Sequence, residues 1–255
     1  MPAIPACRGV LGEIQSGDHA GLLLDFYLRQ AGDEGAARRD LFAAAISATR
    51  SAAGIYRPAF DRWLREVQPQ AQRNVQVAGR LVVGLGAGST LETGLTLHHV
   101  YGVPLIPGSA LKGLASSYCH TEWGERDPLY RSESESGAHR VLFGTNDHSG
   151  CIVFHDAWIL PESLEDGGGL ALDVMTPHHS KYYMTGGRNA AADTDDPNPV
   201  TFLSVTGRFR LALSCTAGTL AEQSQWAELA MELLLQATAE WGAGGKTSSG
   251  YGRMS

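Results

Sequence analysis

Residues 200–241 read VTFLSVTGRFRLALSCTAGTLAEQSQWAELAMELLLQATAEW, and this stretch contains two kinds of regular structure in succession. Its first part, 200–216, alternates between apolar and polar side chains, which predicts two strands or one hairpin. Apolar residues then recur every three or four positions over 221–240, which predicts a long amphipathic helix that ends at Gly242. Strands followed directly by a helix indicate a mixed fold.

The rest of the chain extends this order on the N-terminal side. We expect helices within 20–68, a strand over 74–83, a short helix over 109–119, and strands over 151–160 and 170–175. Residues 122–140 are expected to form a polar surface excursion, and 176–199 a long irregular loop.

The resulting core order is β-α-β-β-α-β with large insertions, a ferredoxin-like or RRM-type plan of the α+β class. Its antiparallel sheet would carry both helices on one face. We therefore predict a single domain over 1–255, with a helical N-terminal part over about 20–70 and the ferredoxin-like core over about 74–255.

Composition excludes several classes of protein. The chain has 255 residues, is 43% hydrophobic and carries a net charge of −7, so it can bury a full core. It has no apolar run long enough for a membrane span and no apolar N-terminal segment typical of a secretory signal. Its four cysteines are far apart, which argues against a disulfide scaffold or a zinc ribbon. We expect a cytoplasmic protein with no membrane partner.

Charge is unevenly distributed along the chain. Residues 80–121 and 241–255 carry more basic than acidic residues, whereas 148–180 holds five acids and 215–240 holds four, and neither of these two contains lysine or arginine. The glycine-rich segments are thus the locally basic ones. Because a local potential guides a polyanion more than net charge does, nucleic acid remains a candidate ligand, and the acidic segments are candidates for protein contacts.

Two glycine-rich turns resemble nucleotide-binding motifs but lack essential positions. The first contains Gly84, Gly86 and Gly88, but Ser89 stands where a dinucleotide-binding turn needs its last glycine. The second, Gly244-Gly245-Lys246-Thr247, lacks the leading glycine of a P-loop and has only eight residues after it. What remains is a flexible turn in each case or, for the first, a loop whose glycines let a backbone approach closely because they have no Cβ. The amides and ammonium group of the second suit a phosphate.

Two further groups of residues have candidate roles. Ser109 is a candidate N-cap, and Lys112 follows one turn later, so this helix start is either an ordinary cap or an anion site. Nine histidines occur without metal-binding spacing, and we predict no metal site, cofactor or catalytic residue. His98 and His99 remain alternatives as a general base, because both are close in sequence to the basic turn.

Four short motifs, in order along the chain, resemble the RAMP superfamily of CRISPR proteins. They are Gly84-Leu85-Gly86 with Glu92-Thr93-Gly94, then residues 102–113, 150–157 and 242–253. Within that superfamily, 173–179, Tyr182-Tyr183 and 197–205 are similar to the sixth-numbered RAMP subunits of Cmr (type III-B) effector complexes.

The resemblance implies a non-catalytic antiviral subunit at one end of a ribonucleoprotein, where it holds the 3′ part of the guide RNA (crRNA). The implied partners are this RNA, with target RNA as a further candidate, other RAMP subunits and small helical subunits. We expect phosphate contacts without base readout, which would suit many guide sequences. The expected RNA-binding residues are Gly84, Gly86, Gly88, Ser109, Lys112, Gly244, Gly245, Lys246, Thr247 and Arg253.

Two other hypotheses remain open. One is a RAMP endoribonuclease that cleaves RNA without a metal and uses His98 or His99 as its base. The other is a protein-only scaffold whose basic turns have lost their role. The third lysine of the chain, Lys181, has no assigned role.

Overall fold

The computed structural model describes residues 19–27, 36–86, 94–135, 137–176, 188 and 199–255. The N-terminal part is helical as expected, in three pieces: α2 (Ala20–Phe26), α3 (Ala36–Ser51) and α4 (Ala53–Val67). Pro58 lies inside α4. The break between α3 and α4 falls at Ala52, and the apolar faces of all three helices contribute to the core.

The central sheet is antiparallel. Its strands are β1 (Ala71–Gln76), β2 (Leu105–Ile106), β3 (Ile152–Phe154), β4 (Ala157–Ile159) and β7 (Arg208–Cys215). The order is β1-β7-β4-β2, and β3 also pairs with β7. Together with the helices this makes the protein an α+β fold.

Two strand predictions need correction. The strand expected over 74–83 begins earlier and ends at Gln76, because the chain turns at Gly79, whose φ is +87°. The strand expected over 151–160 is divided into β3 and β4. The residue responsible is Asp156, whose Oδ1 accepts a hydrogen bond from the amide of Gly108 at 2.7 Å and so leaves the strand to cap a helix.

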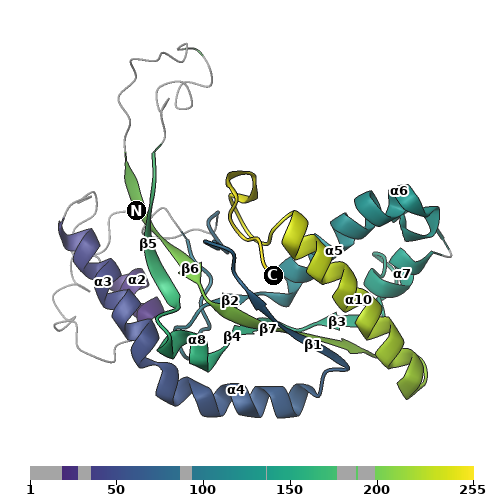
Figure 1. Ribbon diagram of the computed structural model, residues 1–255, viewed down its shortest axis with the longest axis horizontal. Helices are drawn as coiled ribbons and strands as arrows, with labels where there is room; N and C mark the ends of the chain where they lie inside the picture. The colour runs from purple at the N-terminus through teal and green to yellow at the C-terminus, as the bar shows by residue number, and fades with distance from the viewer. Residues whose placement is uncertain (1–18, 28–35, 87–93, 136, 177–187, 189–198) are drawn as a thin grey trace.

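A second sheet of two strands forms an arm on one side of the molecule (Figure 1). It consists of β5 (Gly169–Met175) and β6 (Val200–Thr206), paired antiparallel from Gly169↔Thr206 to Met175↔Val200. Because β6 pairs with β5, it makes no hairpin with β7, and the two-strand alternative for 200–216 is the correct one. Gly207, with φ +120°, separates the two strands.

Helices α5 (Gly108–Tyr118) and α10 (Leu220–Glu240) confirm two helix predictions. They pack against each other, since the Tyr118 hydroxyl donates to Glu240 at 2.8 Å, and α10 crosses the sheet in Figure 1. A capping box between Thr219 and Glu222 starts α10. On the opposite face of the sheet, the Trp158 ring of β4 stacks on Trp63 of α4 at 5.0 Å.

The expected surface excursion over 122–140 forms short helical segments. The shorter helices of the structure are η1 (Cys119–Trp123), α6 (Gly124–Arg126), η2 (Pro128–Tyr130), α7 (Ala138–Phe143), α8 (Pro161–Glu165) and η3 (Thr247–Ser249). The excursion is held to α10 by Trp123, whose indole nitrogen donates to Gln236 at 2.9 Å. Among the helices that the structure describes, none has the length and hydropathy to cross a membrane.

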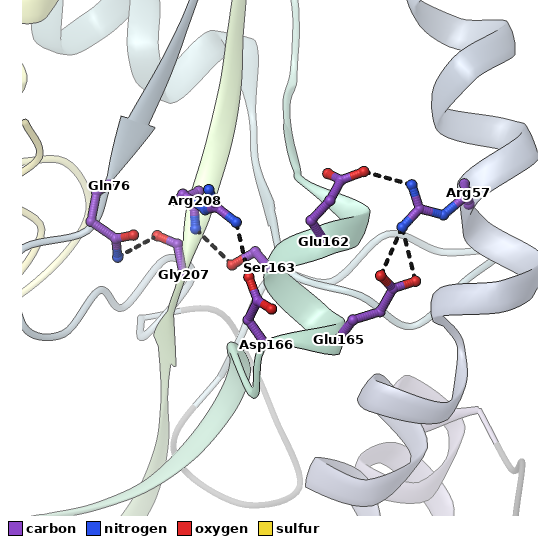
Figure 2. A network of polar contacts seen from close by, with 8 residues as sticks. All are labelled: Arg57, Gln76, Glu162, Ser163, Glu165, Asp166, Gly207 and Arg208. Carbon is purple, nitrogen blue, oxygen red and sulfur yellow. Dashed lines mark hydrogen bonds and ion pairs between the residues drawn. The ribbon is translucent and has the colours of Figure 1, made fainter.

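Helix α8 ties α4 to the sheet through a polar network (Figure 2). The Arg57 guanidinium reaches Glu162 at 2.5 Å and Glu165 at 2.8 Å, which joins α4 to α8. On the other side of α8, the Ser163 hydroxyl accepts from the amide of Arg208 at 2.9 Å. The Arg208 side chain also meets Asp166 at 3.0 Å, so the start of β7 is fixed to α8. This network holds the helical N-terminal part and the sheet as one unit.

Candidate nucleic-acid interface

The turn after α10, which we call the C-terminal turn (residues 242–253), is closed by its own backbone. The amide of Ala243 donates to the carbonyl of Gly252 at 2.8 Å, and that of Tyr251 donates to Lys246 at 3.3 Å. A Cβ on Gly252 would lie 1.9 Å from the Ala243 carbonyl oxygen, and its φ is +77°. Only glycine fits there, so this residue is required by the fold itself.

The C-terminal turn packs against the turn that follows β1, the β1 turn (residues 79–86). The amide of Gly245 donates to the carbonyl of Val82 at 2.8 Å, and the amide of Gly252 donates to that of Arg80 at 2.7 Å. A Cβ on Gly244 would lie 2.2 Å from the Val82 oxygen. The two glycine-rich turns whose residues were predicted to bind RNA therefore lie against each other.

Lys246 is the central cation of the surface that the C-terminal turn and the β1 turn form together. Its backbone is left-handed (φ 59°, ψ 28°) and leads directly into the 3-10 turn η3. Among the described residues, none accepts a hydrogen bond from the amides of Lys246, Thr247 or Ser248. Successive amides in such a conformation point into one concavity that favours an anion.

The Lys246 side chain lies on the arm. Its Nζ is 3.9 Å from Sδ of Met175 and 5.7 Å from the centroid of the Phe202 ring, a cation–π arrangement. Within the described part of the chain, it forms no ion pair with a carboxylate. Its positive charge is therefore positioned by apolar contacts and left without a neutralising acid.

A second link joins the C-terminal turn to the arm. The Tyr251 hydroxyl donates to Oδ2 of Asp173 at 2.9 Å, and Nε of Arg80 lies 3.9 Å from the same oxygen. Burial raises the pKa of Tyr251, and the hydrogen bond to Asp173 raises it further. Neither Asp173 nor Arg80 was among the predicted RNA-binding residues, although Arg80 belongs to the basic segment 80–121.

The predicted glycines divide into two kinds. Gly84 has φ +91°, and a Cβ there would meet Oγ1 of Thr96 at 2.5 Å, so the fold requires it, as it requires Gly244. Among the described residues, a Cβ on Gly86 would have no neighbour within 4 Å, and one on Gly245 would have none closer than 3.7 Å. Within that part of the chain, these two glycines have room beside them for a ligand. Gly88 lies outside the described residues, as does Lys181.

The start of α5 differs from the prediction. Ser109 is not the N-cap; Pro107 occupies that position without a side-chain bond, and Asp156 binds the first amide of the helix instead. Ser109 is exposed in the first turn. Lys112 lines a polar hollow of about 300 Å³ together with the loop 143–150. Among the described residues, no hydrogen bond or ion pair joins Lys112 to the C-terminal turn, and the residues that line the hollow include none of that turn.

Two other predicted residues belong to the C-terminal turn. Thr247 is half-buried at the beginning of η3. The Arg253 guanidinium donates to the carbonyl of Ala239 at 3.0 Å, near the C-terminal end of α10. A positive charge there also interacts favourably with the negative end of the helix dipole. Arg253 is exposed and is engaged within the fold.

His98, the alternative general base, is packed among aromatic rings. It lies 4.8 Å from Tyr101 and 4.7 Å from Trp158, ring centroid to ring centroid. Its Nδ1 accepts a hydrogen bond from the amide of Val100 at 3.2 Å, and burial lowers its pKa. These contacts give His98 a structural role in the packing between β4 and α4. His99 is exposed. Among the described residues, no group of three or more metal-binding side chains occurs.

The sequence profile of the RAMP superfamily matches residues 74–255. The chain belongs to the RAMP superfamily. Its RAMP match begins within β1 and includes both glycine turns, α5, the arm and α10, whereas α2, α3 and all of α4 precede it. The surface around Lys246 is thus built entirely from RAMP segments.

Individual RAMP relatives agree with this assignment. The chain is 31% identical to the protein named CRISPR system Cmr subunit Cmr6 of Pyrococcus furiosus, over 69% of this chain. It is 27% identical to the Cmr6 subunit of Saccharolobus solfataricus, over 45% of this chain. The chain spans 64% of the first relative's length and 33% of the second's.

A solved structure shares the fold of this RAMP chain. A chain of the type III-B Cmr-beta complex bound to cognate target RNA superposes with a TM-score of 0.61 at 20% identity, covering 85% of this chain and 70% of that one. The likeness in three dimensions therefore extends over more of the chain than the RAMP profile alone.

Proposed function

We propose that this chain is a guide-RNA-binding structural subunit of a type III-B Cmr effector complex, at the end that holds the 3′ part of the guide. The observation that carries the proposal is the meeting of two RAMP glycine turns around Lys246, whose ammonium group has no acidic partner among the described residues. The names of the two Cmr6 relatives supply the complex. Guide and target RNA, other RAMP subunits and small helical subunits are the proposed partners, in the cytoplasm.

The chemistry of the surface suits a sugar-phosphate backbone. The amides of Lys246 and Thr247, which have no acceptor among the described residues, offer donors to phosphate oxygens. In the same part of the chain, Gly86 and Gly245 leave room for the RNA strand to approach closely. Such contacts fix the position of the RNA and read no sequence, which is what a subunit serving many guides needs. Charge neutralisation would make binding fall as salt rises.

A non-catalytic role is part of the proposal. What supports it is the position of His98, whose half-buried ring contacts Tyr101 and Trp158 and whose Nδ1 already accepts a hydrogen bond from Val100. A general base needs a free nitrogen within hydrogen-bond reach of its substrate.

We also interpret the central sheet as an elaborated ferredoxin-like sheet. In that interpretation, Met254, bridged to Val77, stands for the last strand, and the spatial order becomes C-terminal segment, β1, β7, β3/β4. This is the neighbour order expected when the two βαβ halves interleave, with α5 and α10 as the two helices.

The test is purification of the tagged chain from its host, followed by sequencing of bound RNA and mass spectrometry of bound proteins. Guide RNA together with other RAMP subunits is the expected result. Metal-free RNA cleavage by the purified chain, lost in a His98→Ala/His99→Ala variant, would establish the endoribonuclease instead. Co-purifying proteins without RNA, together with salt-independent assembly, would establish the protein-only scaffold.

A further inference from the structure

The outer edge of β1 has backbone groups available for a further strand. In the described part of the chain, β1 pairs with β7 on one side, and on the other side only its last residue is paired. There Gln76 exchanges two hydrogen bonds with Ser255, at 2.7 and 3.1 Å, so its N–H and C=O point outward. Because these groups alternate along a strand, those of Asn74 and Gln72 point outward as well.

A groove runs beside this edge. It has a volume of about 590 Å³ and lies between Arg73 of β1 and one side of α10, with Leu229, Met231 and Leu235 as its apolar floor. Leu229 and Leu235 are only partly buried. A strand added to β1 would place every second side chain over this floor.

The rim of the groove is acidic. Glu228 and Glu232 line it, and Arg73 pairs with Glu228 at 2.7 Å, which leaves Glu232 without a cation among the described residues. The surrounding segment 215–240 contains four acids and no lysine or arginine. Such a rim repels phosphates and attracts a basic polypeptide. None of these residues belongs to the surface around Lys246.

We propose that this groove binds an extended segment of a partner protein, which adds to β1 as an antiparallel strand opposite Asn74 and Gln72. Pairing on that edge already occurs with the same polarity, since Met254 bridges Val77 antiparallel. The side chains that face α10 are apolar, and a lysine or arginine among them reaches Glu232. Main-chain hydrogen bonds give such a complex its affinity, and the pockets for alternate side chains give it specificity.

Arg73 protects the edge when the groove is empty. Besides its pair with Glu228, its Nη1 donates to the carbonyl oxygen of Gln72 at 2.8 Å. This contact occupies one of the outward acceptors that a new strand would use, in the way that charged side chains guard exposed sheet edges. Two substitutions in the groove should therefore act in opposite directions. Arg73→Ala frees the acceptor and makes the rim more acidic, whereas Glu232→Lys removes the attraction for a basic side chain.

The experiment uses the full chain and the acetylated, amidated peptide Lys-Thr-Leu-Thr-Leu-Thr-Lys, measured by calorimetry. Its lysines and leucines face α10 in the proposed pairing, and its threonines exchange hydrogen bonds with Asn74 and Gln72. We expect Arg73→Ala to tighten binding by about threefold to tenfold, and Glu232→Lys to weaken it by about tenfold. Glu66→Lys, an exposed residue of α4 with the same change of charge, is the matched control and should leave binding unchanged.

A second peptide separates strand addition from charge attraction. N-methylation of its three threonines removes the donors that face β1 and keeps every side chain, so its binding should be lost. Amide exchange followed by NMR should show protection of Gln72 and Asn74 only with the unmodified peptide. Equal binding of the two peptides, or no protection of these two amides in the bound state, would overturn the proposal.

Discussion

The Tyr251 hydroxyl donates a 2.9 Å hydrogen bond to the carboxylate of Asp173, across 78 positions of the sequence. This contact connects the C-terminal turn to β5 of the arm. Arg80 of the β1 turn approaches the same carboxylate oxygen to 3.9 Å, so three segments meet at one acidic side chain. The side chain of Asp173 is only 19% exposed. Leaving its carboxylate without these two partners would therefore cost more free energy than it would for a fully exposed carboxylate.

Tyr251→Phe should weaken the junction between the arm and the C-terminal turn. It removes one hydrogen bond to a largely buried carboxylate, and we expect a loss of about 1 to 2 kcal/mol in the free energy of unfolding. Urea unfolding of Tyr251→Phe, Asp173→Asn and the double variant measures the coupling between the two side chains. If the two single effects simply add up in the double variant, the hydrogen bond contributes nothing to stability.

Helices α5 and α10 followed from local sequence, whereas the divided strand did not. α10 has a continuous apolar period and its own capping box, and α5 has a compact apolar side after a proline, so neighbouring residues specify both. The interruption between β3 and β4 depends on Asp156 capping a helix 48 positions away. Likewise, the alternating pattern of β6 fits any sheet, and only tertiary packing directs it to β5 instead of β7.

Alanine substitutions in the glycine turns should separate fold from function. Gly244→Ala places a Cβ 2.2 Å from the Val82 oxygen at a φ of +80°, and should cost at least about 2 kcal/mol of stability. Gly86→Ala places a Cβ that meets no atom of the described residues within 4 Å, so it should change stability by less than about 0.5 kcal/mol. It should weaken RNA binding, because the added methyl group narrows the space in which the RNA backbone approaches the turn. Thermal unfolding and fluorescence anisotropy with a labelled RNA measure the two effects. Unchanged RNA affinity of Gly86→Ala would remove this turn from the interface.

Lys246→Ala should weaken RNA binding without regard to RNA sequence. The loss of one phosphate contact should reduce the slope of log affinity against log salt by about 1. Lys246→Arg is the matched control, because it keeps the charge. An unchanged salt slope in the alanine variant would show that Lys246 does not contact phosphate.

Lys112→Ala should act independently of Lys246→Ala. The two lysines belong to separate surfaces, since Lys112 lines the hollow beside loop 143–150. Their effects on the free energy of RNA binding should therefore add within about 0.5 kcal/mol in the double variant. A larger coupling energy in the binding titrations would mean that both lysines hold the same phosphate.

The candidate site was predictable in its cations and glycines, because unusual composition marks them in the sequence. Its apolar support was not predictable. Met175 is 71 positions from Lys246 and lies, like Phe202, in a strand whose pattern indicates only a sheet. Ser109 illustrates the opposite error: its type and position fit an N-cap, yet the carboxylate of Asp156 reaches the helix amide from another segment.

Three histidines should make the protein less stable in mild acid. Burial lowers the pKa of His98, His139 and His155 in the folded state. The unfolded chain, in which a histidine titrates near pH 6.5, therefore binds more protons below that pH than the folded chain does. The free energy of unfolding must then fall as the pH drops from 7 to 5. His98→Phe keeps a ring between Tyr101 and Trp158 but cannot be protonated, so its stability should fall less steeply over this range. Urea unfolding at half-unit pH intervals measures both slopes; a wild-type protein that became more stable toward pH 5 would show that these histidines gain protons on folding.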